Sequence, residues 1–224
     1  MKNIFSLATL LSLLFVGSLD AQTTATRKVL PVPYNSQELN NWCWAASANM
    51  IMQYWHAQDS SATLMSQCEQ AIALWRNTNP GQQITETCPL AEPPPDHLNI
   101  GYAPFQVDNS YAMSTTTTPL SWDSVKHQID NGLPFATEWK YQGVTDGQEV
   151  EDNHWLIVVG YQTSQYGTEP FISYCDPWAA DNAIYKLVPF SEYTNPDLPA
   201  LINHPGLNFT DNIATYYNIR PKKK

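Results

Sequence analysis

Residues 37–55 read Gln-Glu-Leu-Asn-Asn-Trp-Cys-Trp-Ala-Ala-Ser-Ala-Asn-Met-Ile-Met-Gln-Tyr-Trp, and the rest of the chain is organised around this stretch. Asn40 and Asn41 precede an apolar pattern, and an Asn side chain can accept hydrogen bonds from the free N–H groups of a first helical turn. The pattern therefore predicts a helix that begins close to Cys43. The apolar residues that recur at helical spacing are Trp44, Ala48, Ile51, Met52 and Trp55.

Cys43 falls in the first turn of this predicted helix. Aligned peptide dipoles place about half a positive charge at a helix N-terminus, which favours a thiolate over a thiol. A thiolate in such a position is a common form of nucleophilic cysteine. The alternative is a small residue of the core, because free cysteines are often buried.

Two later stretches supply a histidine and a carboxylate at the ends of strand-like runs. Residues 154–161 read His-Trp-Leu-Ile-Val-Val-Gly-Tyr, and residues 171–178 read Phe-Ile-Ser-Tyr-Cys-Asp-Pro-Trp. His154 joins a rigid apolar strand, whereas His56 lies about 20 Å along the helix from Cys43 at 1.5 Å per residue. The remaining histidines lie in polar or loop-like stretches, and they are His97, His127 and His204.

Asp176 ends its strand-like run and precedes a proline, which stiffens the backbone that would position its carboxylate. An Asp before Pro is also a common turn residue, so a purely local role is the alternative. The competing acidic and amide residues are Asp152, Asn153, Asp181 and Asn182.

Taken in order, Gln37, the pair Cys43-Trp44, His154 and Asp176 resemble the papain-like cysteine peptidases. In that family a Gln six residues before a Cys-Trp pair is followed by a His and then by an Asn or Asp. The bacterial branch related to bacteriocin-leader peptidases and to papain-like effector proteases is the most similar. Asp176 stands where papain itself has Asn. Further matching stretches are 32–34, 132–136, 154–161 and 176–178.

The resemblance implies an α+β fold with two lobes. An N-terminal helical lobe would carry Cys43, and a C-terminal curled antiparallel sheet would carry His154 and Asp176. It also implies a cysteine endopeptidase in which Cys43 is the nucleophile, His154 the base, Asp176 its orienting group and Gln37 an oxyanion donor. Such an enzyme acts on a peptide or protein substrate and needs no cofactor and no metal ion.

Other interpretations of the same residues stay open. A cell-wall peptide hydrolase, an amidase or a transglutaminase-like enzyme also uses a Cys, a His and an acid in this order. A papain-fold protein that only binds its partner is a further alternative. A zinc site would use Cys43, Cys175, His154 and Asp176, but no Cys-x-x-Cys or His-x-x-x-His spacing supports it.

The N-terminus predicts export. Residues 1–21 combine a basic start with an apolar run too short to span a bilayer, which is typical of a secretory signal cleaved after Ala21 or after Ser18. Residues 22–224 then form a single domain, which we expect to be a secreted or periplasmic monomer without membrane attachment. The net charge of −10 argues against a nucleic-acid partner.

The chain has four cysteines, and export favours pairing of some of them. If Cys43 is a free nucleophile, Cys68 and Cys88 are the best candidates for a disulfide, and the resemblance also points to a second, structural Cys pair. A closed loop of about 20 residues would contribute about 3 kcal/mol. Cys175 is expected to be a buried strand residue.

The remaining elements follow from local patterns. A second helix is expected after Ser60 or Ser61, and a third between Ser121 and Gly132. Residues 143–153 are expected to form an acidic loop that leads to His154, and residues 189–224 to wrap the sheet. Trp155 and Trp178 would shield the His–Asp pair, or simply pack in the core. Strands are predicted near 111–113, 133–140, 156–159, 170–175 and 184–188.

Overall fold

The computed structural model describes residues 25–39, 42–78, 110–145, 148–164, 168–178, 185–195 and 207–222. The predicted secretory signal lies outside these residues. Along the chain the elements are β1 (Arg27–Val29), α1 (Cys43–Gln58), α2 (Gln67–Thr78), β2 (Tyr111–Thr116), α4 (Trp122–Asp130), β3 (Phe135–Thr145), β4 (Gln148–Gln162), β5 (Phe171–Cys175), β6 (Lys186–Pro189), α5 (Phe190–Thr194) and β7 (Leu207–Pro221).

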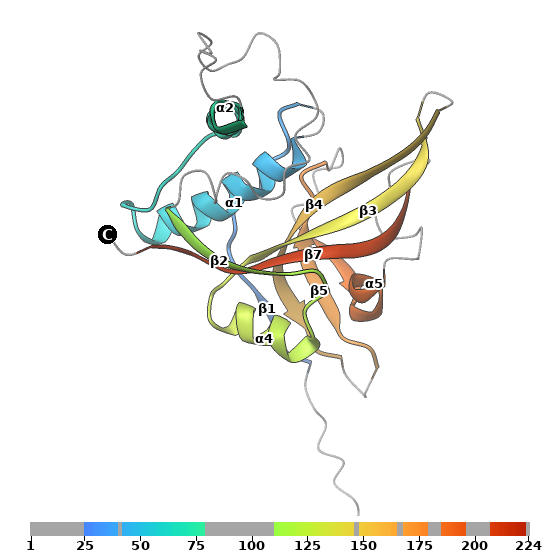
Figure 1. Ribbon diagram of the computed structural model, residues 1–224. Coiled ribbons are helices and arrows are strands. Elements are labelled where there is room, and N and C mark those ends of the chain that lie inside the picture. The colour runs from blue at the N-terminus through green and yellow to red at the C-terminus, as the bar shows by residue number, and fades with distance from the viewer. Residues whose placement is uncertain are drawn as a thin grey trace, which may run out of the picture.

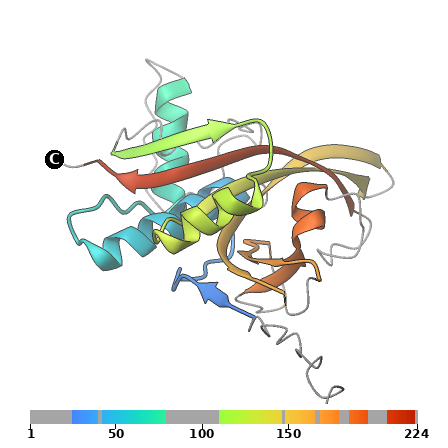
Figure 2. The ribbon, with the colours of Figure 1, turned by 90° about the horizontal axis from the view of Figure 1, so that it is seen from below.

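The described strands form one antiparallel sheet in the order β2-β7-β3-β4-β5-β6, and β1 pairs with β4 beside this path. Figure 1 shows the sheet strongly curled, with α1 and α2 gathered on one side of it. Figure 2, in which the molecule is seen from below, shows α1 and α4 lying against the sheet. The fold is α+β, with a helical N-terminal part and a sheet-rich C-terminal part, as the sequence predicts.

Helix α1 is the buried centre of the helical part. It begins at Cys43, as predicted, but Trp42 rather than Asn40 or Asn41 occupies the N-cap position, and no Trp42 side-chain bond caps the helix. Asn40 and Asn41 lie outside the described residues. Residues 43–52 of α1 are all buried, which the run of small residues from 45 to 48 permits by allowing close approach of other elements.

Side-chain bonds anchor α1 to the sheet at both of its ends. Ser47 Oγ donates to the backbone oxygen of Trp155 at 3.3 Å, next to His154 on β4. Trp55 Nε1 donates to the backbone oxygen of Ile219 on β7 at 3.0 Å. The first turn of α1 therefore lies directly against the start of the buried part of β4.

The second helix begins later than the sequence pattern suggests. Ser66 rather than Ser60 or Ser61 precedes α2, and its hydroxyl accepts a hydrogen bond from the N–H of Glu69 at 3.2 Å. The Glu69 carboxylate in turn accepts from Ser66 N–H at 2.7 Å. These reciprocal bonds form a capping box, which satisfies donors that the helix itself leaves free.

The structure contradicts the loop predicted over residues 143–153. Strands β3 and β4 continue as a long hairpin, paired from Phe135 with Val158 out to Thr145 with Gln148. The acidic and glycine-containing composition of residues 143–153 suggested a loop, but the hydrogen bonds between strands join backbone groups. Strands can therefore form with many kinds of side chain. Strand β7 also pairs with β3 as far as Gly143.

The prediction for the C-terminal region is also wrong. Instead of wrapping the sheet, residues 207–221 form β7, which lies inside the sheet between β2 and β3.

The predicted limits of α4 are confirmed. Ser121 caps α4 by accepting from Ser124 N–H, and Gly132 follows that helix with φ of 71°.

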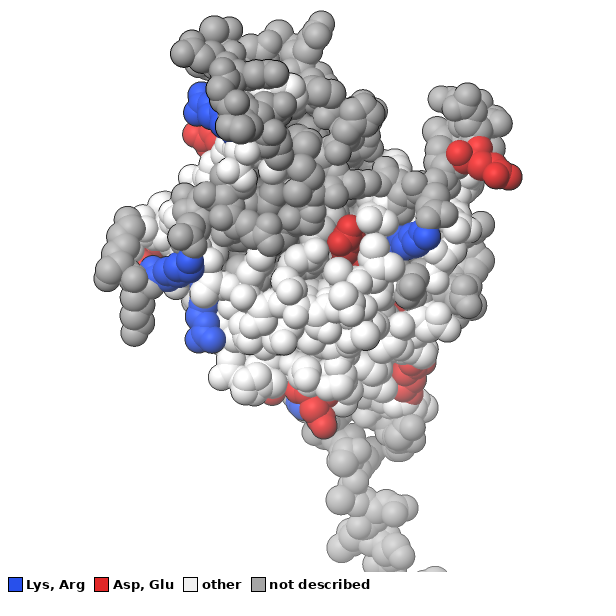
Figure 3. All heavy atoms as spheres, viewed as in Figure 1, with Lys and Arg blue, Asp and Glu red and all other residues white. Residues whose placement is uncertain are grey.

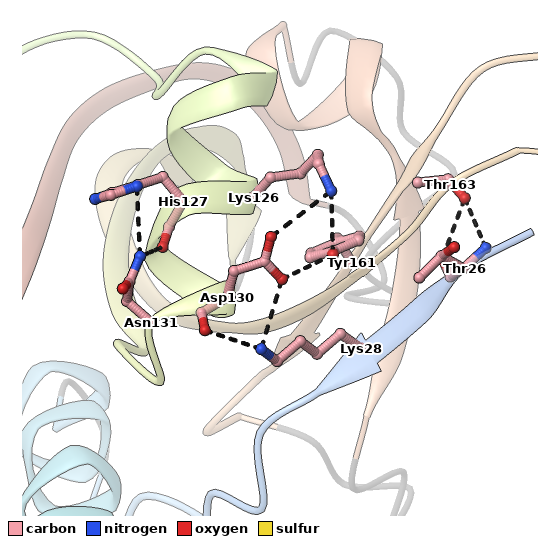
Figure 4. Close-up of polar contacts among 8 residues, drawn as sticks. All are labelled: Thr26, Lys28, Lys126, His127, Asp130, Asn131, Tyr161 and Thr163. Atoms are coloured by element: carbon pink, nitrogen blue, oxygen red, sulfur yellow. Dashed lines mark hydrogen bonds and ion pairs between the residues drawn. The ribbon is translucent and has the colours of Figure 1, made fainter.

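A polar cluster ties α4 to β1 and β4 (Figure 4). The Tyr161 hydroxyl donates to Asp130 Oδ1 at 2.9 Å and accepts from Lys126 Nζ at 3.1 Å. Lys28 Nζ donates to the backbone oxygen of Asp130 at 3.0 Å. Burial alone would raise the pKa of Asp130, but the hydrogen bond from Tyr161 and the charges of Lys126 and Lys28 lower it. The cluster fixes the seating of α4 on the sheet, far along β4 from His154.

Among the described residues on the face seen in Figure 3, charged side chains are few and are scattered around a broad uncharged area. None of the helices in the described ranges is long and apolar enough to cross a membrane.

Gly160 on β4 lies against the backbone of β1. A Cβ atom there would lie 2.4 Å from Lys28 O and 2.9 Å from Val29 Cα, both of them backbone atoms that cannot swing aside. We expect Gly160→Ala to lower the free energy of unfolding by about 1–3 kcal/mol, the usual cost of overpacking. Urea unfolding followed by tryptophan fluorescence measures this change.

Ser173→Ala is the matched control, because Ser173 faces Gly160 across the β4–β5 ladder. Its buried Oγ makes no hydrogen bond within the described residues, so its removal is expected to be nearly neutral. Equal midpoints for Gly160→Ala and the wild type would contradict the steric interpretation.

Candidate active site

Cys43 is the first residue of α1 and is a free, buried cysteine. The first N–H groups of a helix have no acceptor within the helix, so the Cys43 amide is a donor without an intrahelical partner. The positive end of the helix dipole lies at the same point. The local environment that the sequence predicts for this thiol is therefore present.

His154 lies on β4 with its side chain buried. Its Nε2 is 2.7 Å from Asp176 Oδ1, and the Cys43 side chain is a second hydrogen-bond partner of the imidazole. Because Asp176 occupies Nε2, Nδ1 is the ring nitrogen that remains for Cys43. The three side chains thus form a continuous chain of thiol, imidazole and carboxylate, drawn from α1, β4 and the end of β5.

The charge state of His154 follows from this arrangement. Burial alone would lower the pKa of His154, but the charge of Asp176 and its hydrogen bond, with smaller contributions from Cys43, raise that pKa to about 10. The imidazole is therefore protonated at neutral pH. The imidazolium therefore places a positive charge beside the Cys43 side chain.

Asp176 is fully buried directly after β5. Its Oδ1 also accepts a hydrogen bond from the Trp178 N–H at 2.9 Å, so the local turn role and the contact with His154 coexist. Its Oδ2 lies 3.6 Å from Lys186 Nζ on β6. Sequence reasoning missed Lys186, because only the register of β6 on β5, which pairs Lys186 with Tyr174, brings it to Asp176.

Gln37 is held beside this group through its backbone. Its N–H donates to the backbone oxygen of Pro177 at 2.8 Å, one residue after Asp176. Its side-chain Oε1 is buried and makes no hydrogen bond within the described residues. The side-chain amide is thus held close to the site without being used by the fold.

The two tryptophans have different surroundings. The ring of Trp178 lies 5.6 Å from the His154 ring and is 38% exposed, so it covers the imidazole on its solvent side. Trp155 points to the opposite face of the sheet, because side chains alternate along a strand, and its ring lies 4.7 Å from that of Tyr216. Trp155 is a core residue, and only Trp178 has the position expected of a shield.

The other two described cysteines take no part in the contact between Cys43, His154 and Asp176. Cys175 is buried and not disulfide-bonded, and burial together with the charge of Asp176 raises its pKa to about 12, which keeps it a neutral thiol. Cys68 is buried on α2, whereas Cys88 lies outside the described residues, so their pairing stays a prediction. Among the described residues, no three His, Cys, Asp or Glu side chains are arranged to hold a metal ion.

The model of the Peptidase_C39 like family matches residues 29–196, a range that includes Gln37, Cys43, His154 and Asp176. No curated protein matches the chain.

Proposed function

The chain belongs to the Peptidase_C39 like family, and we propose that it is an exported cysteine endopeptidase whose site is formed by Cys43, His154, Asp176 and Gln37. The observation that carries this proposal is the hydrogen-bonded series from the Cys43 thiol through buried His154 to Asp176. A peptidase family supports a peptide or protein as the substrate.

In the proposed mechanism the Cys43 thiolate attacks the carbonyl carbon of the scissile peptide bond, and the carbonyl oxygen becomes an oxyanion. His154 then gives its proton to the leaving amine as the C–N bond breaks, which leaves a thioester on Cys43. Next, His154 takes a proton from water, and the hydroxide attacks the thioester. Collapse of the second intermediate releases the acid and restores the thiolate–imidazolium pair.

The oxyanion needs donors that the folded protein does not already use. The Cys43 backbone N–H and the Gln37 side-chain amide meet this condition, and one such donor contributes about 3 kcal/mol to stabilisation of the transition state. Asp176 holds the imidazole ring in orientation and stabilises its positive charge. Trp178 limits access of water to the pair.

Export belongs to the proposal as well. We propose that residues 1–21 are removed as a secretory signal, that residues 22–224 act as one domain in a secreted or periplasmic location, and that Cys68 pairs with Cys88. Intact-mass measurement of the protein released by its native host tests the cleavage and the disulfide. Cleavage after Ala21 or Ser18 supports export, and a gain of about 2 Da on reduction supports the disulfide.

The test of the enzymatic proposal is labelling with a thiol-reactive peptidyl probe, followed by mapping of the adduct. We expect rapid labelling at Cys43, no adduct in Cys43→Ala, and no reaction at buried Cys175 in the folded protein. Cleavage of an unstructured protein should be lost in the same variant. A folded wild type in which Cys43 is unreactive or disulfide-bonded would contradict the proposal and favour a binding protein.

A further inference from the structure

One side chain of helix α2 holds the segment around Gln37 in place through two hydrogen bonds. Gln67, the first residue of α2, accepts a hydrogen bond at its Oε1 from the Glu38 N–H at 2.9 Å. Its Nε2 donates to the backbone oxygen of Ser36 at 2.8 Å. The amide of Gln67 therefore holds the two peptide groups on either side of Gln37.

The Gln67 side chain that forms this clamp is itself held in place. Gln67 is only 3% exposed, and it follows Ser66, whose capping box with Glu69 fixes the start of α2. A buried side chain with both ends of its amide engaged has little freedom to change rotamer. The position of residues 36–38 is thus set by where α2 begins.

A third bond completes the restraint, because the Gln37 N–H donates to the oxygen of Pro177 beside Asp176. The Gln37 side chain itself makes no hydrogen bond within the described residues, and its Oε1 is buried without a partner. No hydrogen bond from a described residue to the Gln37 side chain therefore fixes its orientation. Its direction is set by its backbone, which Gln67 and Pro177 hold.

We propose that Gln67 is a positioning residue that aims the Gln37 amide at the oxyanion formed on the carbonyl attacked by Cys43. This inference rests on the proposed function. It predicts that the loss of the clamp leaves the thiolate–imidazolium pair intact and weakens only the stabilisation of the oxyanion. A small misplacement of such a donor is costly, since these bonds act at fixed short distances.

The experiment compares two reactions of Cys43 in Gln67→Met, which keeps the side-chain length but loses both hydrogen bonds. Acylation by p-nitrophenyl acetate passes through an oxyanion, whereas alkylation by iodoacetamide displaces iodide from a methylene carbon and forms none. We expect acylation to slow by about tenfold or more and alkylation to stay within about twofold of wild type. Where a cleaved peptide is available, kcat should fall and KM should change little.

Gln128→Met is the matched control. Gln128 is also 3% exposed and also makes two side-chain bonds, with Nε2 donating to Asn218 Oδ1 and Oε1 accepting from Asn218 N–H. It lies on α4 and contacts β7 instead of residues 36–38. We expect a comparable loss of stability in the two variants and a selective loss of acylation only in Gln67→Met.

A double-mutant comparison separates positioning from a general structural effect. In a Gln37→Ala background, Gln67→Met should slow acylation by less than about twofold, because the group it positions is gone. An unchanged acylation rate in Gln67→Met, or an equal effect with and without Gln37, overturns the inference while the wild type still reacts. A wild-type Cys43 that reacts with neither reagent overturns the proposed function itself, and this inference with it.

Discussion

Replacement of His154 by alanine is expected to lower peptide hydrolysis by roughly 10⁴-fold, the scale of loss of a base that acts as a unit with its nucleophile. His154 is the only described histidine that contacts both Cys43 and Asp176. Without it the Cys43 side chain loses the positive charge beside it, and the leaving amine loses its proton donor.

The pH dependence of alkylation at Cys43 gives the clearest measurement. In the wild type the raised pKa of His154, about 10, keeps the imidazolium in place, so the rate of reaction with iodoacetamide should be nearly flat around neutral pH. In His154→Ala the rate should be low at pH 6 and rise with pH, following an ordinary thiol with a pKa of about 8.5.

His56→Ala is the control, because His56 lies on the same helix as Cys43. His56 lies in the last turn of α1, where its Nδ1 contacts the backbone oxygen of Ala62 at 2.9 Å, and it is about 20 Å along the helix from Cys43. We expect this variant to keep its activity. A His154→Ala protein that folds, as judged by circular dichroism, and alkylates with the wild-type pH profile would refute the thiolate–imidazolium pair.

The second large effect is expected at Asp176, where two substitutions separate geometry from charge. Asp176→Ala removes the contact with Nε2 of His154 and the acceptor for the Trp178 N–H, so the ring loses its orientation. We expect kcat/KM to fall by about 10²–10⁴-fold. Asp176→Asn keeps an oxygen for one of these bonds but removes the negative charge, and we expect a smaller loss of rate.

The sign of the pH shift in Asp176→Asn follows from the causes of the raised His154 pKa. The charge of Asp176 is the largest of the raising effects, so its loss lets burial lower the pKa of His154. The alkaline limb of kcat/KM, which reports loss of the imidazolium proton, should therefore move to lower pH. Asp130→Asn is the control, because Asp130 also faces lysines but lies in the α4 cluster (Figure 4).

The same charge has a consequence for stability. The pKa of His154 is raised from 6.5 to about 10 on folding, so its contribution to stability is fully present below pH 6.5 and is lost as pH rises through 10. Thermal unfolding should show the wild type exceeding Asp176→Asn by more at pH 6 than at pH 10.5. The electrostatic coupling would be ruled out by two results together. One is an alkaline limb of kcat/KM that stays at the wild-type pH in Asp176→Asn, and the other is a stability difference that is the same at pH 6 and at pH 10.5.

Short-range patterns in the sequence predicted the elements that carry the candidate site, and the resemblance to papain-like cysteine peptidases linked their residues into one site. Helical spacing placed the start of a helix at Cys43, and apolar runs predicted the strands that carry His154 and end at Asp176. Ser121 and Gly132 marked the limits of α4 in the same way. Each of these features depends on the conformational preferences of neighbouring residues, which are visible in one segment of chain.

The tertiary structure decided the features that depend on which strand pairs with which. Composition alone predicted a loop at residues 143–153 and a wrapping tail after 189, whereas pairing with β3 makes them parts of β4 and β7. Strand register brings Lys186 to Asp176, and the start of α2 brings Gln67 to the peptide groups around Gln37. Backbone pairing and single side-chain contacts between distant segments have no local signature, because their free energy arises only when the whole chain is packed.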